Sequence, residues 1–162
     1  MTDPIIRFSH ASFGFPGVVA LEDVTLDIQE GEFVGVIGPN GSGKTTMCRA
    51  ILGLMHPLAG HLNIFDCACE QLRCHHRARI GYLPQKGRLD PNFPITVLEA
   101  VMMGRYGALG LFRRPGKRDR ELALEALGNV GMTEHRETVL GRLSGGQQQR
   151  ILIARALAQQ PK

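Results

Sequence analysis

The chain has 162 residues, of which 43% are apolar and 21% are charged, and its formal net charge is +4. These values are ordinary for one soluble globular domain. No apolar run approaches the ~18 residues of a membrane span, and the first residues lack a basic region followed by an apolar stretch, so we expect neither a transmembrane helix nor a signal peptide.

Alternating residues in the N-terminal third predict strands. Apolar side chains fall on one face of one segment and polar side chains on the other: Val24, Leu26 and Ile28 against Thr25 and Asp27. Together with two further extended segments, Ile5 to Phe8 and Val18 to Leu21, this pattern predicts an antiparallel layer in the N-terminal part of the chain.

A glycine-rich segment between a predicted strand, Phe33 to Ile37, and a predicted helix, Lys44 to Met55, has the context that a P-loop requires. Its residues are Gly38, Pro39, Asn40, Gly41, Ser42, Gly43, Lys44 and Thr45. Glycines let successive N–H groups converge on a phosphate, and the helix dipole adds to that field. Lys44 would bridge the β- and γ-phosphates, and the Thr45 hydroxyl would ligate Mg²⁺.

Cysteines raise a second question. Three of the four lie close to two histidines: Cys67, Cys69, Cys74, His75 and His76. Thiolates and imidazoles can coordinate zinc, but this spacing fits no standard structural zinc pattern. A metal site therefore remains one interpretation, and exposed reduced thiols on a short helical turn are the one we favour.

In the helix after the glycine-rich loop we expect a buried face of Met47, Ile51 and Leu54, with Cys48 as a small core residue.

The pattern becomes helical after Gln85. A short strand, Ile80 to Leu83, is expected to deliver Gln85 at its C-terminal end. Thr96 is the predicted cap of a helix from Val97 to Met103. A further helix, Arg118 to Val130, carries an apolar face formed by Leu122, Ala126 and Val130.

Much of the positive charge lies between these two helices, from Phe112 to Arg120. A solvated turn and helix start is the default interpretation. Contact with a transmembrane partner or with anionic head groups is the alternative. Nucleic-acid binding is disfavoured because the segment is short and has little aromatic interleaving.

A second motif, Leu143 to Gln147, precedes a predicted helix from Gly145 to Gln159, with Ser144 as a good N-cap. In the company of the P-loop and of Gln85, this motif makes the chain resemble the ATP-binding subunit of an ABC transporter. Gly38 to Thr45 matches the Walker A motif, Gln85 the Q-loop glutamine and Leu143 to Gln147 the signature motif. All three are intact and in the family's order.

The resemblance implies an α/β fold, with a P-loop NTPase core of the ABC ATPase type, an N-terminal antiparallel β layer and a helical subdomain. Residues 1–85 would form the β layer, the P-loop core and the Q-loop, and residues 86–160 the helical subdomain and signature helix. The family has a Walker B Asp-Glu pair and a switch histidine after the signature helix. No such residues occur by Lys162, and Asp90, Glu99 and Asp119 lie in regions that the family uses otherwise. We therefore expect a partial domain, incomplete at its C-terminus, that hydrolyses no ATP alone.

The resemblance also assigns roles. ATP with Mg²⁺ would be held between two subunits paired head to tail, with Phe15 stacked on adenine, Thr45 and Gln85 on Mg²⁺, and Lys44, Gln85 and Ser144 as catalytic residues. The complete implied nucleotide site is Phe15, Gly38, Pro39, Asn40, Gly41, Ser42, Gly43, Lys44, Thr45, Thr46, Gln85, Ser144, Gly145, Gly146 and Gln147.

The residues around and after Gln85 are similar to those of manganese, zinc or iron importers, notably Phe93 to Val97 and Met103 to Gly107. This implies a permease partner, a second ATP-binding subunit and, indirectly, an extracytoplasmic metal-binding protein, at the cytoplasmic face of the membrane. Two alternatives stay open: the ATPase of an iron-chelate or vitamin importer, and a non-transport ABC-type ATPase.

Overall fold

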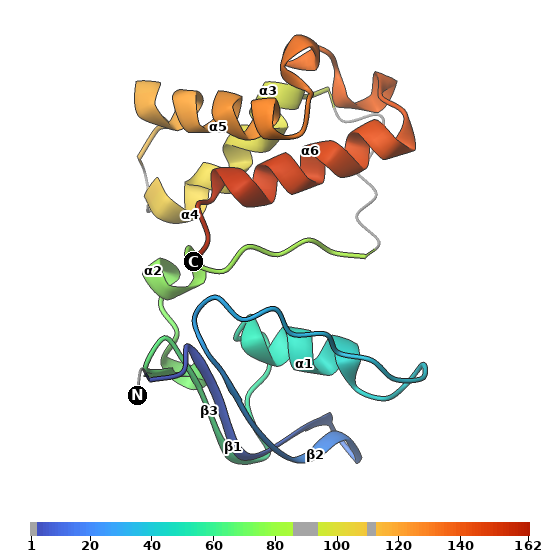
Figure 1. Cartoon of the computed structure of the whole chain (residues 1–162), viewed down its shortest axis with the longest axis vertical. Coiled ribbons are helices and arrows are strands. Elements are labelled where there is room, and N and C mark those ends of the chain that lie inside the picture. The colour runs from blue at the N-terminus through green and yellow to red at the C-terminus, as the bar shows by residue number, and fades with distance from the viewer. Residues whose placement is uncertain (1–2, 86–93, 110–112) are drawn as a thin grey trace. The chain divides into compact units, whose positions relative to one another are not determined.

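The computed structural model describes residues 3–85, 94–109 and 113–162, and the side chain of Cys74 is outside this description, as are Asp90 and Phe112 (Figure 1). The chain forms two compact units, Met1–Arg77 and Ala78–Lys162. Each unit is described by itself.

The first unit is built on an antiparallel sheet of four strands in the order β2-β1-β3-β4. The strands are β1 (Ile6–Phe15), β2 (Val18–Ile28), β3 (Ala59–Ile64) and β4 (Cys67–Ala68). In β2, Val24, Leu26 and Ile28 are half-buried and Thr25 and Asp27 are exposed. The predicted antiparallel layer and its alternation are therefore confirmed.

The sheet buries its apolar face unevenly along β1. Phe8 and Phe13 are both buried, and their rings meet edge to face with centroids 6.1 Å apart. Register shifts in the pairing with β2 lie between these two residues, where His10 adopts a φ of 48°. Such bulges interrupt the two-residue alternation, which is why Phe8, Ala11 and Phe13 can all face the interior.

Helix α1 (Lys44–Ile51) begins where the sequence predicts and ends earlier than Met55. Gly53 has a φ of 65°, its N–H donates to Ala50 O, and the N–H of Leu54 donates to Arg49 O. These two bonds form a Schellman motif, which stops the helix. Leu54 lies beyond this stop and is exposed, so its predicted burial is wrong.

The remaining expectations for α1 are also only partly met. Met47 and Ile51 are half-buried, whereas Cys48 is exposed, so its assignment to the core is wrong. The buried residues of the helix are Thr46 and Ala50.

The two predicted strands Phe33 to Ile37 and Ile80 to Leu83 do not form, and both predictions are wrong. Phe33 and Ile37 are 101% and 97% exposed. A strand is stabilised by hydrogen bonds to a neighbour. Among the described residues neither segment has a paired strand beside it, so the apolar sequence alone does not make one.

The second unit is helical. Its principal helices are α3 (Val97–Met102), α5 (Lys117–Asn129) and α6 (Gly145–Ala158), and α4 (Tyr106–Leu109) is a single turn. Short 3₁₀ turns cover Met103–Arg105, Thr133–His135 and Leu140–Arg142. Thr96 caps α3 in a capping box with Glu99, as predicted.

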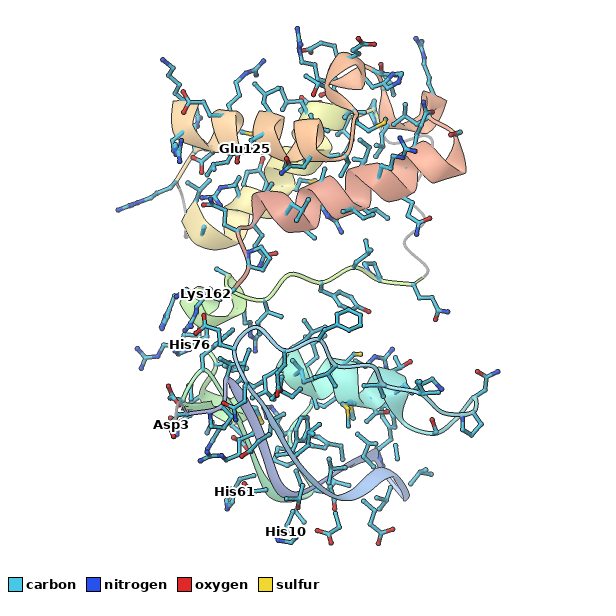
Figure 2. All side chains as sticks on the ribbon, in the orientation of Figure 1. Asp3, His10, His61, His76, Glu125 and Lys162 are labelled. Atoms are coloured by element: carbon cyan, nitrogen blue, oxygen red, sulfur yellow. The ribbon has the colours of Figure 1, made fainter. Side chains whose placement is uncertain are left out.

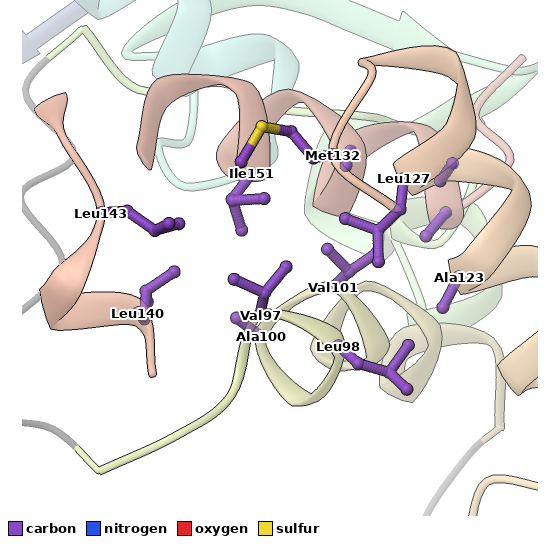
Figure 3. Close-up of a cluster of buried hydrophobic side chains, with 13 residues drawn as sticks. Val97, Leu98, Ala100, Val101, Ala123, Leu127, Met132, Leu140, Leu143 and Ile151 are labelled. Atoms are coloured by element: carbon purple, nitrogen blue, oxygen red, sulfur yellow. The ribbon is translucent and has the colours of Figure 1, made fainter. Parts of the chain in front are cut away.

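The helices meet in one apolar cluster (Figure 3). Leu122 and Ala126 of α5 are buried as predicted, and Val130, the residue after α5, packs partly buried against the cluster. The cluster consists of Val97, Leu98, Ala100, Val101, Ala123, Ala126, Leu127, Met132, Leu140, Leu143, Ile151, Ala154 and Ala158. This packing fixes α6 against both α3 and α5.

A buried ion pair fixes the C-terminal end of α6. Arg105 Nε donates to Asp119 Oδ1 at 3.0 Å, and Arg105 Nη1 donates to Ala158 O at 2.9 Å. Both charged side chains are 11% exposed. Gly104 allows this approach, because a Cβ there would lie 2.2 Å from Arg155 O.

Candidate functional site

The glycine-rich loop leads directly into α1, and the surroundings of Gly43 explain its residue type. Gly43 is the N-cap of α1, with a φ of 84°. A Cβ at this position would lie 2.5 Å from Leu21 Cδ2 and 2.6 Å from Ala20 O, both on β2. The start of α1 is therefore packed against the sheet so closely that a residue without a side chain is required.

The first turn of α1 favours an anion. A helix leaves its first N–H groups without intrahelical acceptors, and its dipole makes this end positive. No side chain caps α1, and its first turn contains no acidic residue. Backbone donors at this end are thus available to a ligand such as phosphate.

Lys44 adds a full positive charge to the same loop. Its Nζ donates to Gly38 O at 2.8 Å and to Pro39 O at 2.6 Å, and Ser42 Oγ lies 3.4 Å away. Within the described part of the chain, no carboxylate forms an ion pair with Lys44. The ammonium is therefore held over the loop by neutral carbonyls, and an anionic ligand would meet no competing carboxylate among the described residues.

The two threonines after Lys44 differ in accessibility. Thr45 is exposed, so its hydroxyl can reach a ligand, whereas Thr46 is 7% exposed. Thr46 could contribute through its backbone N–H rather than its hydroxyl. The roles predicted for Thr45 and Thr46 stay predictions.

Phe15 lies at the end of β1 and is 49% exposed. It lines an apolar hollow of about 340 Å³ together with Gly14, Pro16, Gly17, Val18, Val19 and Leu58. Phe15 pairs with Val18 of β2, and Leu21, three residues further along β2, contacts the Gly43 position. Three residues of a strand span about 10 Å. Residues Val18 to Leu21 of β2 thus connect the position of Phe15 to the start of α1 at Gly43.

The signature motif forms a rigid start to α6. Ser144 is the N-cap, and Gln147 N donates to Ser144 Oγ at 3.3 Å while Ser144 N donates to Gln147 Oε1 at 2.9 Å. This capping box confirms Ser144 as the predicted cap. Gly145 and Gly146 are exposed, and apart from their chain neighbours and the backbone of α6 itself, no described atom lies within 4 Å of a Cβ built on either.

His135 and Gln148, which the sequence analysis did not identify, support the signature motif. Gln147 Nε2 lies 3.4 Å from His135 Nε2, and Gln148 Nε2 donates to Leu143 O at 3.2 Å. The carboxamide of Gln147 is therefore engaged within its own unit. No short-range signal marks His135, since it lies twelve residues before Gln147.

Gln85 lies in a turn and is exposed. It belongs to the second unit with Ser144 to Gln147, whereas Phe15 and residues 38–46 belong to the first. The predicted site residues are thus divided between the two units, and their common nucleotide site stays a prediction.

The cysteine cluster differs from the expected exposed thiols. Cys67 is half-buried and Cys69 is buried, so that expectation is wrong for Cys69. Burial, followed by the nearby Glu70, raises the pKa of the Cys69 thiol to about 11, which disfavours the thiolate that metals require. Among the described residues no group of three or more His, Cys, Asp or Glu could hold a metal ion. His76 also lies apart from His10 and His61 (Figure 2).

Comparison with known proteins gives a consistent family. Residues 21–162 match the family model described as ABC transporter. The chain is 46% identical over 139 residues to the manganese transport system ATP-binding protein MntB of Bacillus subtilis (strain 168), covering 86% of this chain and 54% of that protein. It is 44% identical over 139 residues to the zinc transport system ATP-binding protein TroB of Treponema pallidum (strain Nichols), covering 86% and 51%.

The fold has solved counterparts. The structure of cbiO1 from Clostridium perfringens, part of the ABC transporter complex cbiONQ, superposes with a TM-score of 0.81 at 26% identity, covering 99% of this chain and 64% of that chain. The chain spans about half the length of the two curated relatives. None of the helices in the described residues has both the length and the apolar character to cross a bilayer.

Proposed function

Because the chain belongs to the ABC transporter family, we propose that residues 38–46 bind the phosphates of Mg-ATP and that the complete protein powers import of a metal ion through a partner permease. The proposed transported ion is manganese, zinc or iron. The names of the manganese and zinc relatives support this choice. The fold expectation, a P-loop ABC ATPase core with an antiparallel β layer and helices, is confirmed.

The observation that carries the proposal is the start of α1. Gly43 seats this turn on β2, no side chain occupies its N-terminal donors, and Lys44 holds an unpaired charge over it. An arriving triphosphate would replace the two carbonyls as partner of the ammonium. A charge-assisted contact of this kind contributes about 1.5–3 kcal/mol.

The residues also fit the ion that accompanies ATP. Thr45 offers an exposed hydroxyl oxygen and Gln85 an exposed carboxamide, both oxygen donors of the type that Mg²⁺ accepts. When bound, the ion neutralises charge on the phosphate oxygens. Phe15 would stack on the base from the rim of its apolar hollow.

The signature motif would act on the nucleotide of a second subunit. Gly145 and Gly146 are exposed and unobstructed, so a phosphate can approach the backbone at the start of α6, with Ser144 beside it. Two copies would then close head to tail around two ATP molecules, and hydrolysis would reopen them. We place this assembly at the cytoplasmic face of the membrane, with a permease and an extracytoplasmic metal-binding protein.

Titration of the 162-residue chain with a fluorescent ATP analogue and Mg²⁺ tests the phosphate site. Lys44→Ala should weaken binding about 10- to 100-fold, the equivalent of one charge-assisted contact. Arg49→Ala, which removes an exposed charge from the same helix, is the matched control and should leave the affinity nearly unchanged. Equal affinities for wild type and Lys44→Ala would exclude the proposed role of Lys44.

A further inference from the structure

The net charge of the chain is concentrated in one short segment, residues 113–120. This segment contains five basic residues and one acidic residue, a net of +4, which is also the formal net charge of the entire chain. The five basic residues are exposed: Arg113, Arg114, Lys117, Arg118 and Arg120. The remainder of the chain therefore has a net charge of zero, and five basic residues within eight positions make this segment a dense run of positive charge.

The single carboxylate of the segment does not compensate this charge at the surface. Asp119 is 8% exposed and is occupied internally, since its Oδ2 accepts from Gly116 N at 2.9 Å and its Oδ1 from Arg105 Nε. The backbone N–H of Gly116, followed by the interaction with Arg105, lowers the pKa of Asp119, so this carboxylate remains ionised and paired. The surface of the segment thus carries only positive charge.

Neighbouring acidic residues neutralise only part of the positive charge of residues 113–120. Arg118 pairs with Glu121 at 3.6 Å and Arg120 with Glu137 at 3.9 Å, and all four side chains are at least half exposed. Such pairs are weak in water. In the described part of the chain, Arg113, Arg114 and Lys117 have no ion pair at all. The positive end of the α5 dipole lies in the same place.

An exposed aromatic residue follows the arginine that pairs with Asp119. The Arg105–Asp119 ion pair joins the turn before α4 to the first turn of α5. Tyr106, the first residue of α4, follows Arg105 directly and is 53% exposed. Basic residues together with an exposed aromatic ring are the composition of surfaces that rest on the head-group region of a membrane.

We propose that the three exposed cations Arg113, Arg114 and Lys117, here called the basic surface, bind anionic phospholipid head groups directly. This contact goes beyond any attachment through a permease and does not depend on ATP binding. Each basic residue near an anionic bilayer contributes about a five-fold gain in partitioning. The three unpaired cations together should therefore account for about 100-fold.

Flotation of the 162-residue chain with vesicles tests this proposal. Binding to vesicles of phosphatidylglycerol mixed with phosphatidylcholine should be strong at low salt and lost at high salt, because the attraction is screened. The triple variant Arg113→Gln, Arg114→Gln, Lys117→Gln should lose about 100-fold in partitioning. These side chains are exposed and form no ion pair with another described residue, so circular dichroism should show an unchanged fold.

The matched control is a second triple variant, Arg49→Gln, Arg142→Gln, Arg150→Gln, which removes the same charge from exposed positions elsewhere. The partitioning of this control variant into anionic vesicles should fall only a few-fold. Equal losses in the two variants would overturn the proposal in favour of a net-charge effect. Equal binding to pure phosphatidylcholine would overturn it in favour of apolar adsorption, for instance through Phe33 and Ile37.

Two further arms separate other ligands. Inorganic phosphate at constant ionic strength should not displace the vesicles, and displacement would show a phosphate site instead. Conversely, tighter binding of a labelled DNA duplex than of anionic vesicles, lost in the same triple variant, would identify a nucleic-acid surface and overturn the membrane assignment. Replacement of Arg113 and Arg114 by lysine should preserve vesicle binding, because the attraction depends on charge rather than on guanidinium geometry.

Discussion

The glycine at the start of α1 allows a prediction in which two physical effects can be separated. Gly43→Ala forces an L-residue to keep a φ of 84°, which costs about 1–2 kcal/mol. It also places a methyl group 2.5 Å from Leu21 Cδ2 and 2.6 Å from Ala20 O. Leu21 can rotate, but the carbonyl of Ala20 belongs to β2 and cannot move without disturbing the sheet. Overpacking of this kind costs about 1–3 kcal/mol.

Gly41→Ala provides the matched control for this prediction. Gly41 has a φ of 85°, yet apart from its two chain neighbours no described residue has an atom within 4 Å of a Cβ built there. This variant should therefore cost only the backbone term, about 1–2 kcal/mol. Gly43→Ala should cost about 2–5 kcal/mol in total, and the difference between the two variants isolates the contact with β2.

Native-state hydrogen exchange is the suitable assay because the chain has two units and one unfolding curve would mix them. Exchange of the β1 and β2 amides reports the free energy of opening the first unit. Gly43→Ala should lower it by about 1–3 kcal/mol more than Gly41→Ala does. Equal values for the two variants would refute the argument that α1 is seated on β2 through Gly43.

Three further outcomes are expected. Asp119→Asn should lower the free energy of opening the second unit by about 3 kcal/mol at neutral pH, measured by amide exchange in α5 and α6. The pKa of Asp119 is lower in the folded state, so its contribution to stability is complete above the unfolded pKa of ~3.9 and is lost as pH falls through the folded pKa. The difference in stability between wild type and Asp119→Asn should therefore shrink below about pH 4. A difference that stays constant with pH would contradict this. Ser144→Ala should cost about 1 kcal/mol, seen as faster amide exchange in the first turn of α6, and unchanged exchange would mean that the cap is dispensable. Replacing both Phe33 and Ile37 with lysine should reduce self-association in light scattering, whereas Leu54→Lys, also at an exposed apolar position, should change it little; equal effects would deny the 33–37 segment a special role.

The elements that could be predicted from sequence are those whose signals are local. Thr96 and Ser144 each form a capping box with the residue three positions later, and both boxes are present. The alternation of Val24, Leu26 and Ile28 is likewise a property of neighbouring residues, and it appears in β2. A cap or an alternating face needs no information about distant parts of the chain.

The features that could not be predicted depend on contacts with residues far away in the sequence. The segments Phe33 to Ile37 and Ile80 to Leu83 have strand-like composition, but a strand is decided by what pairs with it. The Arg105–Asp119 ion pair and the bond from Arg105 to Ala158 O join positions 14 and 53 residues apart. No spacing rule connects such positions, and the same holds for His135 beside Gln147.

The central claim, that residues 38–46 hold the phosphates of ATP, is tested most directly by amide NMR of the ¹⁵N-labelled 162-residue chain during titration with Mg-ATP. We predict the largest shifts at the amides of Gly41, Ser42, Gly43, Lys44, Thr45 and Thr46, because these donors would bind the phosphate oxygens. Adenosine without phosphates should leave them nearly unchanged. The absence of shifts at these amides, or shifts confined to another surface, would contradict the claim.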